Sequence, residues 1–344
     1  MIITPRTILL AAAALALPGT PALAADYYAG KTIEFIVGGG PGGGYDIYAR
    51  TVARHLSRHI PGSPAIVVKN MPGAGSGKAA QYISSIAPKD GTSIAGIMPG
   101  AIMAPLLDDR SKPLFDPTKV RYVGTANSGT RVCVTLKGTR IKTFADTRTV
   151  PAKFGGSGPN DSTYEYGYMH KNTAGAIFDI VAGYRGTPDM ALAIERGELD
   201  GVCGWDWSSF KSQRPDWLRD NKVNLLLQVS MNPHPELTGM GVPGVFDFVK
   251  SEDDRKVVEL IISQTIFHRS YIAPPETPPA QLEVLRAAFD KTMADPQFLA
   301  DAEKMRIDIA PLPGAKVQAV VEKLYAAPAA IVERARKAIR PNSQ

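Results

Sequence analysis

The sequence predicts an α/β protein of two lobes, each a mostly parallel sheet with flanking helices. Short β-branched apolar runs alternate with segments of helical periodicity, which is the pattern of parallel strands joined by helices. Glycine-rich turns directly follow the first two of these runs. The chain of 344 residues also exceeds what one compact core usually holds. Two α/β lobes therefore explain the pattern better than one large sheet.

The first 24 residues have the order of a cleavable signal peptide. Arg6 is their single charged residue, an apolar run follows over residues 8–17, and Ala22, Leu23 and Ala24 form a small-residue end. The apolar run is too short to span a bilayer, which weighs against an amino-terminal anchor. We expect cleavage after Ala24 and an exported mature protein.

The first part of the mature chain repeats one unit of strand, glycine-rich turn and helix. The expected elements are strands over residues 33–37, 65–68 and 93–98 and helices over residues 49–60 and 79–87. Sheets of this kind bind ligands beyond the carboxyl ends of their strands. The two glycine-rich turns, residues 38–44 and 72–77, lie at those ends and are therefore expected to face a ligand.

A second set of elements follows residue 121. Its expected strands are residues 132–136, 152–155, 178–181, 199–203 and 225–229, and its helices are residues 164–172 and 188–196. Helices near residues 257–264, 279–293 and 296–305 and one ending near residue 338 complete the chain. Two further strand-to-helix turns, residues 154–163 and 183–189, are candidates for the second wall of a cleft.

Neither glycine-rich turn of the first lobe fits a nucleotide site. Residues 38–43 match G-x-G-x-x-G, but the next strand ends in Lys69 and Asn70 without the acid that would bind a ribose. Residues 72–78 resemble a P-loop, but Pro72 replaces its first glycine and Ala79 its Ser/Thr. We expect no cofactor.

These turns are suited to a simpler anion. Glycine lets the backbone approach a ligand closely, and the free amides at a helix N-terminus attract negative charge. Two such turns on neighbouring strands would suit a carboxylate without any Arg or Lys. The alternative is that the glycines serve only tight strand-to-helix turns.

Aromatic residues in the second lobe are also candidates for the pocket. Trp205 and Trp207 follow the strand over residues 199–203, and Asp206 stands between them. With Tyr45 they favour a ligand that has an aromatic or bulky apolar part. Burial of the two tryptophans in the core is the alternative. Tyr184 and Arg185, in the turn over residues 183–189, are further candidates for contact with the ligand.

Several function classes find no support in the sequence. The net charge of +6 is spread along the chain without a block of Lys and Arg, so we expect no nucleic-acid partner. His55 and His59 lie four residues apart, but beside arginines and without a carboxylate ligand, so we expect no metal site. The chain shows no recognisable nucleophile-and-base set, so we expect no enzymatic activity.

Cys133 and Cys203 are the two cysteines of a chain bound for an oxidising compartment. That compartment permits a disulfide between them. Both also lie in predicted buried strands, where a free thiol behaves as a small apolar side chain. The sequence leaves both states open.

Four blocks of the mature chain resemble the blocks of one known family. They are K-T-I-E-F-I-V (31–37) running into P-G-G-G-Y-D-I-Y-A-R (41–50), then V-V-K-N-M-P-G-A-G (67–75) followed by A-P-K-D-G (87–91), then G-Y-R-G (183–186), and last I-A-P-P-E-T-P (272–278). With these blocks, in this order, the chain resembles the Bug family, the receptors of tripartite tricarboxylate transporters. The resemblance covers nearly the whole mature chain.

This resemblance implies a periplasmic, monomeric, type II (Venus-flytrap) binding protein that closes on a carboxylate and delivers it to membrane permease subunits. It implies lobe 1 from residues 26–126 and 269–344 and lobe 2 from residues 127–268, with crossovers near Asn127 and His268. Together with the turns, it gives this candidate ligand-binding set: Gly42, Gly43, Gly44, Tyr45, Asp46, Gly73, Ala74, Gly75, Ser76, Ser157, Gly158, Ser162, Thr163, Tyr184, Arg185, Trp205 and Asp206. The alternatives are a sensor that signals to a membrane kinase and a secreted α/β hydrolase.

Overall fold

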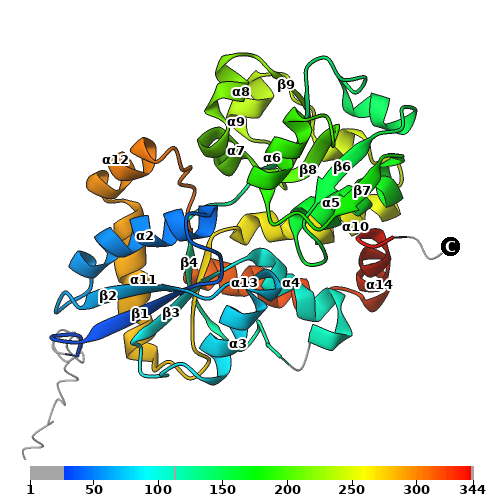
Figure 1. The fold of residues 1–344 in the computed structure, drawn as a ribbon. Coiled ribbons are helices and arrows are strands. Elements are labelled where there is room, and N and C mark those ends of the chain that lie inside the picture. Colours follow the sequence, from blue (N-terminus) through cyan, green and yellow to red (C-terminus); the bar gives the residue numbers. More distant parts are fainter. Residues whose placement is uncertain (1–26, 112–113, 342–344) are drawn as a thin grey trace, which may run out of the picture.

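A computed structural model describes residues 27–111 and 114–341 of the chain. The predicted signal peptide and its cleavage site lie outside these residues. Two separate sheets form the centres of two lobes (Figure 1). The predicted two-lobed α/β fold is therefore confirmed.

The first sheet has six strands and is mixed. In spatial order they are β11 (Leu312–Pro313), β4 (Arg121–Thr125), β10 (Ser270–Ala273), β3 (Ser93–Ile97), β1 (Thr32–Val37) and β2 (Ala65–Asn70). β1 pairs in parallel with both β2 and β3, as the repeated strand–helix units predict. β10 runs antiparallel to β3 and β4, and β11 runs antiparallel to β4.

The second sheet has five strands. Their order is β7 (Asp179–Ala182), β6 (Lys153–Gly156), β8 (Gly201–Asp206), β5 (Arg131–Leu136) and β9 (Val223–Val229). β6 is parallel to β7 and β8, whereas β5 is antiparallel to β8 and β9. Both sheets are thus mixed rather than mostly parallel. The chain enters the second sheet at β5 and returns to the first sheet at β10, and both of these strands run antiparallel to their neighbours.

Two connections join the lobes. The chain leaves the first sheet after β4 and enters the second at β5, and it returns after the 3-10 helix η6 (Ser263–Phe267) into β10. Asn127 and His268 lie in these two connections. The limits of the lobes along the chain stay a prediction, since the carboxy-terminal helix, residues 329–338, contacts both lobes.

Thirteen α-helices cover the described sheets. They are α2 (Gly44–Leu56), α3 (Gly77–Ser85), α4 (Pro99–Leu107), α5 (Ser162–Ala174), α6 (Thr187–Glu195), α7 (Trp207–Gln213), α8 (Pro215–Arg219), α9 (Pro235–Gly239), α10 (Glu252–Ile262), α11 (Pro279–Met293), α12 (Pro296–Lys304), α13 (Gly314–Tyr325) and α14 (Ala329–Ala338). None of the helices in the described part of the chain is long and apolar enough to cross a membrane.

The hydrophobic core follows the faces of the two sheets. Helices α2, α11 and α12 bury one face of the first sheet through residues such as Tyr48, Leu285 and Phe298. The opposite face packs on α3, α4 and α13, and this cluster continues into the second lobe. Helix α14 packs on α4 of the first lobe and on α5 and α10 of the second, as Figure 1 shows.

Helix α4 and strands β4, β10 and β11 lie where the sequence suggests no regular element. Pro99 occupies the first turn of α4 and Pro105 lies inside it, and an internal proline usually argues against a helix. All three strands have five residues or fewer, and their registers depend on partners distant in the chain. Local periodicity cannot detect elements of this kind.

Candidate functional site

A cavity of about 640 Å³ lies between the two lobes. Its lining comes from the glycine-rich turn before α2, Gly75 of the second glycine-rich turn, the turns before α4, α5 and α6, the end of β8 and helix α7. Arg131 at the start of β5 and Gln264 and Arg269 near the second connection complete it. Of the predicted ligand-binding residues, these line it: Gly42, Gly43, Gly44, Tyr45, Gly75, Ser157, Gly158, Ser162, Thr163, Arg185, Trp205 and Asp206. Gly73, Ala74, Ser76, Asp46 and Tyr184 do not belong to this lining.

Four α-helices begin at the cavity. The lining includes the first residues of α2, α4, α5 and α6, which are Gly44, Pro99, Ser162 and Thr187. The backbone amides of a helix N-terminus lack partners within the helix, and the helix dipole places partial positive charge there. Because helices from both lobes point these ends at one cavity, it is suited to an anion.

Asp46 shapes the first turn from behind. Its carboxylate accepts hydrogen bonds from the Gly42 amide at 2.8 Å, Arg50 Nε at 2.9 Å and Asn70 Nδ2 at 2.9 Å. Burial opposes ionisation, but these hydrogen bonds outweigh it and hold the pKa of Asp46 below its usual value. Gly42 itself has φ 73°, a conformation that favours glycine. Asp46 therefore positions the turn and does not line the cavity.

Ser76 plays a similar structural part in the second turn. It is 1% exposed. Its Oγ donates to the Gly38 carbonyl at 2.9 Å and accepts from the Met98 amide at 3.0 Å, so it connects the ends of β1 and β3. Gly75 is the member of this turn that reaches the cavity, with φ 56°.

In the second lobe, the turn before α5 is held by hydrogen bonds around Asp161. This residue caps α5, since its Oδ1 accepts from the Thr163 amide at 2.9 Å. Thr163 Oγ1 in turn accepts from the Ser157 amide at 3.0 Å. Ser162 Oγ donates to the Gly204 carbonyl at 2.9 Å, which joins the turn to β8. The hydroxyl groups of this wall thus have partners within the protein.

The same turn also contacts the first lobe. Asn160 has φ 65°, and its carbonyl oxygen faces Gly75 and Gly100. A Cβ atom added to Gly100 would lie 2.3 Å from that oxygen, and one added to Gly75 would lie 3.1 Å from it. These glycines let the two lobes approach each other across the cavity, so the structure describes a closed arrangement.

A buried charged cluster lies where the two connections meet β8. Arg269 Nη2 lies 3.1 Å from Asp206 Oδ1, and His268 Nε2 lies 3.1 Å from Asp206 Oδ2. Arg131 Nη2 donates to His268 Nδ1 at 3.0 Å. The Arg269 guanidinium also stacks over Tyr45 and Tyr48, with its Cζ 4.2 and 4.5 Å from the two ring centroids. Asp206, His268 and Arg269 are each at most 4% exposed.

The charges of this cluster follow from burial and proximity. Burial, reinforced by Arg131 and Arg269, lowers the pKa of His268 to about 3, so its imidazole is neutral. Burial alone would raise the pKa of Asp206, but the positive charges of Arg269 and Arg131 outweigh it and hold the pKa well below its usual range. Two guanidinium groups therefore face one carboxylate.

The tryptophans do not present their rings to the cavity. Trp205 borders it, yet its side chain is 1% exposed and packs edge-on against Phe210 and Trp217. Trp207 is equally buried, and its Nε1 donates to Glu236. Both rings belong to the core of the second lobe, where they pack in one cluster with Phe210 and Trp217. The expectation of an aromatic ligand loses this support.

The side chains of the neighbouring residues Tyr184 and Arg185 lie in different environments. Tyr184 packs against the core of the second lobe. Arg185 lines the cavity, but its side chain is 91% exposed and pairs with Asp189 at 3.0 Å. Its position is thus that of a residue at the rim.

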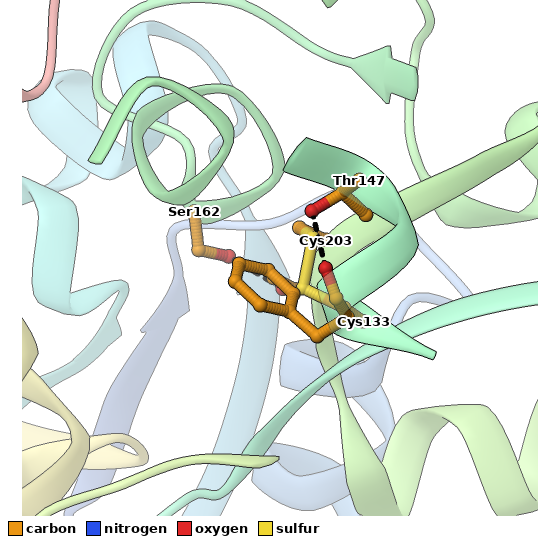
Figure 2. Close-up of a disulfide and its surroundings, with 6 residues drawn as sticks. Cys133, Thr147, Ser162 and Cys203 are labelled. Carbon is orange, nitrogen blue, oxygen red and sulfur yellow. Dashed lines mark hydrogen bonds between the residues drawn. A yellow bond between two sulfur atoms is a disulfide. The ribbon is translucent and has the colours of Figure 1, made fainter. Parts of the chain in front are cut away.

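Cys133 and Cys203 form a disulfide between β5 and β8. Figure 2 shows Thr147 and Ser162 close to it, and the Thr147 hydroxyl donates to the Phe144 carbonyl at 2.6 Å. Ser162 lines the cavity, so the disulfide lies behind the second-lobe wall. His170 is fully buried beside the two sulfur atoms, and within the described part of the chain neither of its ring nitrogens has a hydrogen-bond partner.

Sequence reasoning missed several polar residues of the cavity, among them Arg131, Gln264 and Arg269. All three lie in or next to the connections between the lobes. Arg131 stands at the edge of an apolar run and Arg269 follows the expected crossover at His268, so the local sequence contains only weak signals. Their convergence depends on the pairing of β5 and β10 with strands far away in the chain.

Together these features define a two-lobed solute-binding protein fold with a cavity between the lobes. Similar solved structures include R. palustris Rpa4515 with adipate, at 18% identity and TM-score 0.67, covering 90% of this chain and 97% of that one. MatC from Rhodopseudomonas palustris with bound malate has 17% identity and TM-score 0.63, covering 90% and 99%. The periplasmic binding protein BugD has 18% identity and TM-score 0.65, covering 90% and 97%.

The resemblance to the Bug receptors is thereby confirmed at the level of the fold. In sequence, the chain is 33% identical over 126 residues to a UPF0065 protein of Bordetella bronchiseptica. This match covers 35% of the chain and 37% of the relative. The chain thus spans about a third of the length of that relative, and no family model matches it.

Proposed function

We propose that this protein is a periplasmic receptor of the Bug type, which captures a small carboxylate between its lobes and delivers it to the permease of a tripartite tricarboxylate transporter. The observation that carries the proposal is the convergence of four helix N-termini, from both lobes, on one cavity. Such ends favour an anion without requiring a charged side chain. Binding from both lobes would stabilise the closed form.

The chemistry of the lining agrees with a small acid. Glycine, serine and threonine residues dominate the walls, and Arg131, Arg185 and Arg269 outnumber Asp161 and Asp206. The structurally similar proteins with adipate and malate carry ligands of this class. We propose that the receptor acts as a monomer and reaches the periplasm through the predicted signal peptide.

We further propose that the protein is not an enzyme. Serine, histidine and aspartate do meet at the cavity, which is the combination that a hydrolase would use. However, the hydroxyls of Ser208 and Ser209 both donate to Asp206 Oδ1 at 2.8 Å. His268 Nδ1 accepts from Arg131, and His268 Nε2 faces Asp206. With both serine protons directed at the carboxylate, the arrangement is that of a structural network.

A thermal-shift screen of residues 25–344 against aliphatic di- and tricarboxylates, aromatic acids and amino acids tests the proposal. A ligand at about 100 times its Kd adds roughly 2.7 kcal/mol of stability, which raises Tm by several degrees. We expect one class of acids to do so and to be recovered chemically unchanged. Flat curves for every carboxylate, or a converted compound, would contradict the proposal.

A further inference from the structure

We propose that Arg131 is the charged anchor of the cavity, where its guanidinium pairs with a carboxylate of the bound ligand. This inference rests on the proposed carboxylate-binding function and adds to it a specific ionic contact. The helix N-termini alone would make binding of an acid independent of charged side chains. An ion pair with Arg131 makes the binding of the acid depend on one charged residue, which directly follows the first connection between the lobes.

Arg131 lies next to the first-lobe turn although it is the first residue of β5, a strand of the second sheet. It lines the cavity. Arg131 Nη2 lies 3.0 Å from His268 Nδ1, and the hydroxyl of Tyr45 lies 3.4 Å from the same nitrogen. Tyr45 is the second residue of α2. An anion at the N-terminus of α2 is therefore close to this guanidinium.

The carboxylates around Arg131 are already engaged. Asp206 is occupied by Arg269 and His268, and Asp161 accepts the hydrogen bonds that cap α5. No carboxylate of the described residues forms an ion pair with Arg131, whereas the rim residue Arg185 has Asp189. Arg131 is thus the cavity arginine whose charge the protein itself leaves without a paired anion.

The partly buried position of this charge has an energetic consequence. Arg131 Nε is buried without a hydrogen-bond partner among the described residues, and so is Arg269 Nε. A charge removed from water is unfavourable unless an opposite charge accompanies it. Because His268 is neutral, the cluster carries an excess of one positive charge, and a ligand carboxylate would neutralise it. A guanidinium can bind both oxygens of a carboxylate at once, which a lysine cannot.

The location also links the ligand to closure. Arg131 follows the first connection between the lobes, and His268 and Arg269 lie in the second. Tyr45 belongs to the first lobe and Asp206 to the second, and both contact this cluster. An anion bound here meets groups from both lobes and both connections, so its affinity should be higher for the closed arrangement than for an open one.

The test uses calorimetry on the mature protein with the acid that stabilises it most in the screen. Arg131→Met should raise the Kd of that acid about 10- to 100-fold, the usual effect of losing a hydrogen bond to a charged group. Arg131→Lys, which keeps the charge but not the paired donors, should show a smaller rise. Arg219→Met changes an exposed arginine that does not line the cavity and should leave the Kd unchanged.

A second measurement separates ion pairing by Arg131 from a purely structural role of this residue. It compares the Kd of the acid with the Kd of its amides, in which one carboxylate at a time is replaced by an amide. We expect the wild type to bind one amide at least tenfold more weakly than the acid, and Arg131→Met to lose this discrimination. Equal loss of acid and amides in both Arg131 variants, or an unchanged Kd in Arg131→Met, would overturn the anchor and leave the receptor function standing. A wild-type protein that binds no carboxylate would overturn both.

Discussion

Arg269 Nη2 lies 3.1 Å from Asp206 Oδ1, and this ion pair joins the second connection between the lobes to the strand that forms the cavity wall. Both side chains are almost completely buried, at 2% and 4% exposed. The Asp206 carboxylate also accepts hydrogen bonds from the hydroxyls of Ser208 and Ser209. The pair is therefore the centre of a network that fixes the hinge and the pocket together.

Replacing Arg269 by methionine should be strongly destabilising. The change leaves Asp206 buried without its guanidinium partner, and breaking a buried pair from one side typically lowers the free energy of unfolding by about 3–5 kcal/mol. Urea unfolding followed by tryptophan fluorescence measures the loss. Arg219→Met, which removes an exposed pair with Asp220, serves as the control and should show no measurable loss. A loss below about 1 kcal/mol for Arg269→Met would contradict this account of the network.

Gly100→Ala should weaken ligand binding without unfolding either lobe. The new Cβ would meet the Asn160 carbonyl oxygen at 2.3 Å, a contact that exists only when the lobes are together. Alanine is otherwise well tolerated in the first turn of a helix. We expect at least a tenfold rise in Kd and a larger radius of gyration by small-angle scattering in the presence of ligand. Gly239→Ala is the matched control, because a Cβ there meets nothing within 4 Å.

Removing the disulfide should lower stability but not abolish the pocket. Cys133 and Cys203 are 70 residues apart in sequence, and closing such a loop usually contributes about 2–5 kcal/mol. The double change Cys133→Ala and Cys203→Ala should therefore lower the urea midpoint, and dithiothreitol should shift the wild type towards the variant. If reduced and oxidised wild type unfold at the same urea concentration, the disulfide contributes nothing to stability.

His170 should make the protein sensitive to acid. Burial lowers its pKa from 6.5 to about 3. Below pH 6.5 the unfolded chain binds a proton at this histidine that the folded protein does not, so stability should fall by up to about 1.4 kcal/mol per pH unit as the pH drops towards 3. Urea unfolding between pH 7.5 and 4.5 should give a shallower slope for His170→Leu than for the wild type. Parallel slopes would mean that His170 titrates alike in both states.

Glu165 should have the opposite dependence at neutral to alkaline pH. Burial raises its pKa to about 8, despite the hydrogen bond that it accepts from the Asn160 amide at 3.1 Å. Its contribution to stability is therefore fully present below about pH 4.5, the pKa of the unfolded chain, and is lost as the pH rises through 8. Glu165→Gln should unfold at a higher urea concentration than the wild type at pH 8, with little difference at pH 5. A variant that is less stable at both pH values would contradict a protonated Glu165.

The different positions of Trp205 and Asp206 in the structure could not be predicted from the sequence. Trp205 and Asp206 are adjacent in sequence at the end of a predicted strand, so both are equally good pocket candidates. In the structure, Trp205 packs into the core and Asp206 faces the hinge. Alternation along a strand predicts opposite faces, but only the neighbouring helices decide which face meets the cleft.

The amino-acid sequence by itself determined the two-lobed α/β fold and the turns at the ends of β1 and β6, because strand and helix periodicity, glycines and caps act between near neighbours. Only the tertiary structure decided that Arg131, His268 and Arg269 meet Asp206 at the hinge. Sequence separations of 63 residues or more divide Asp206 from Arg131 and Arg269, and antiparallel pairing of β5 with β8 and the return through β10 bring them together. Contacts of this kind depend on how distant strands pair, and no local pattern records that.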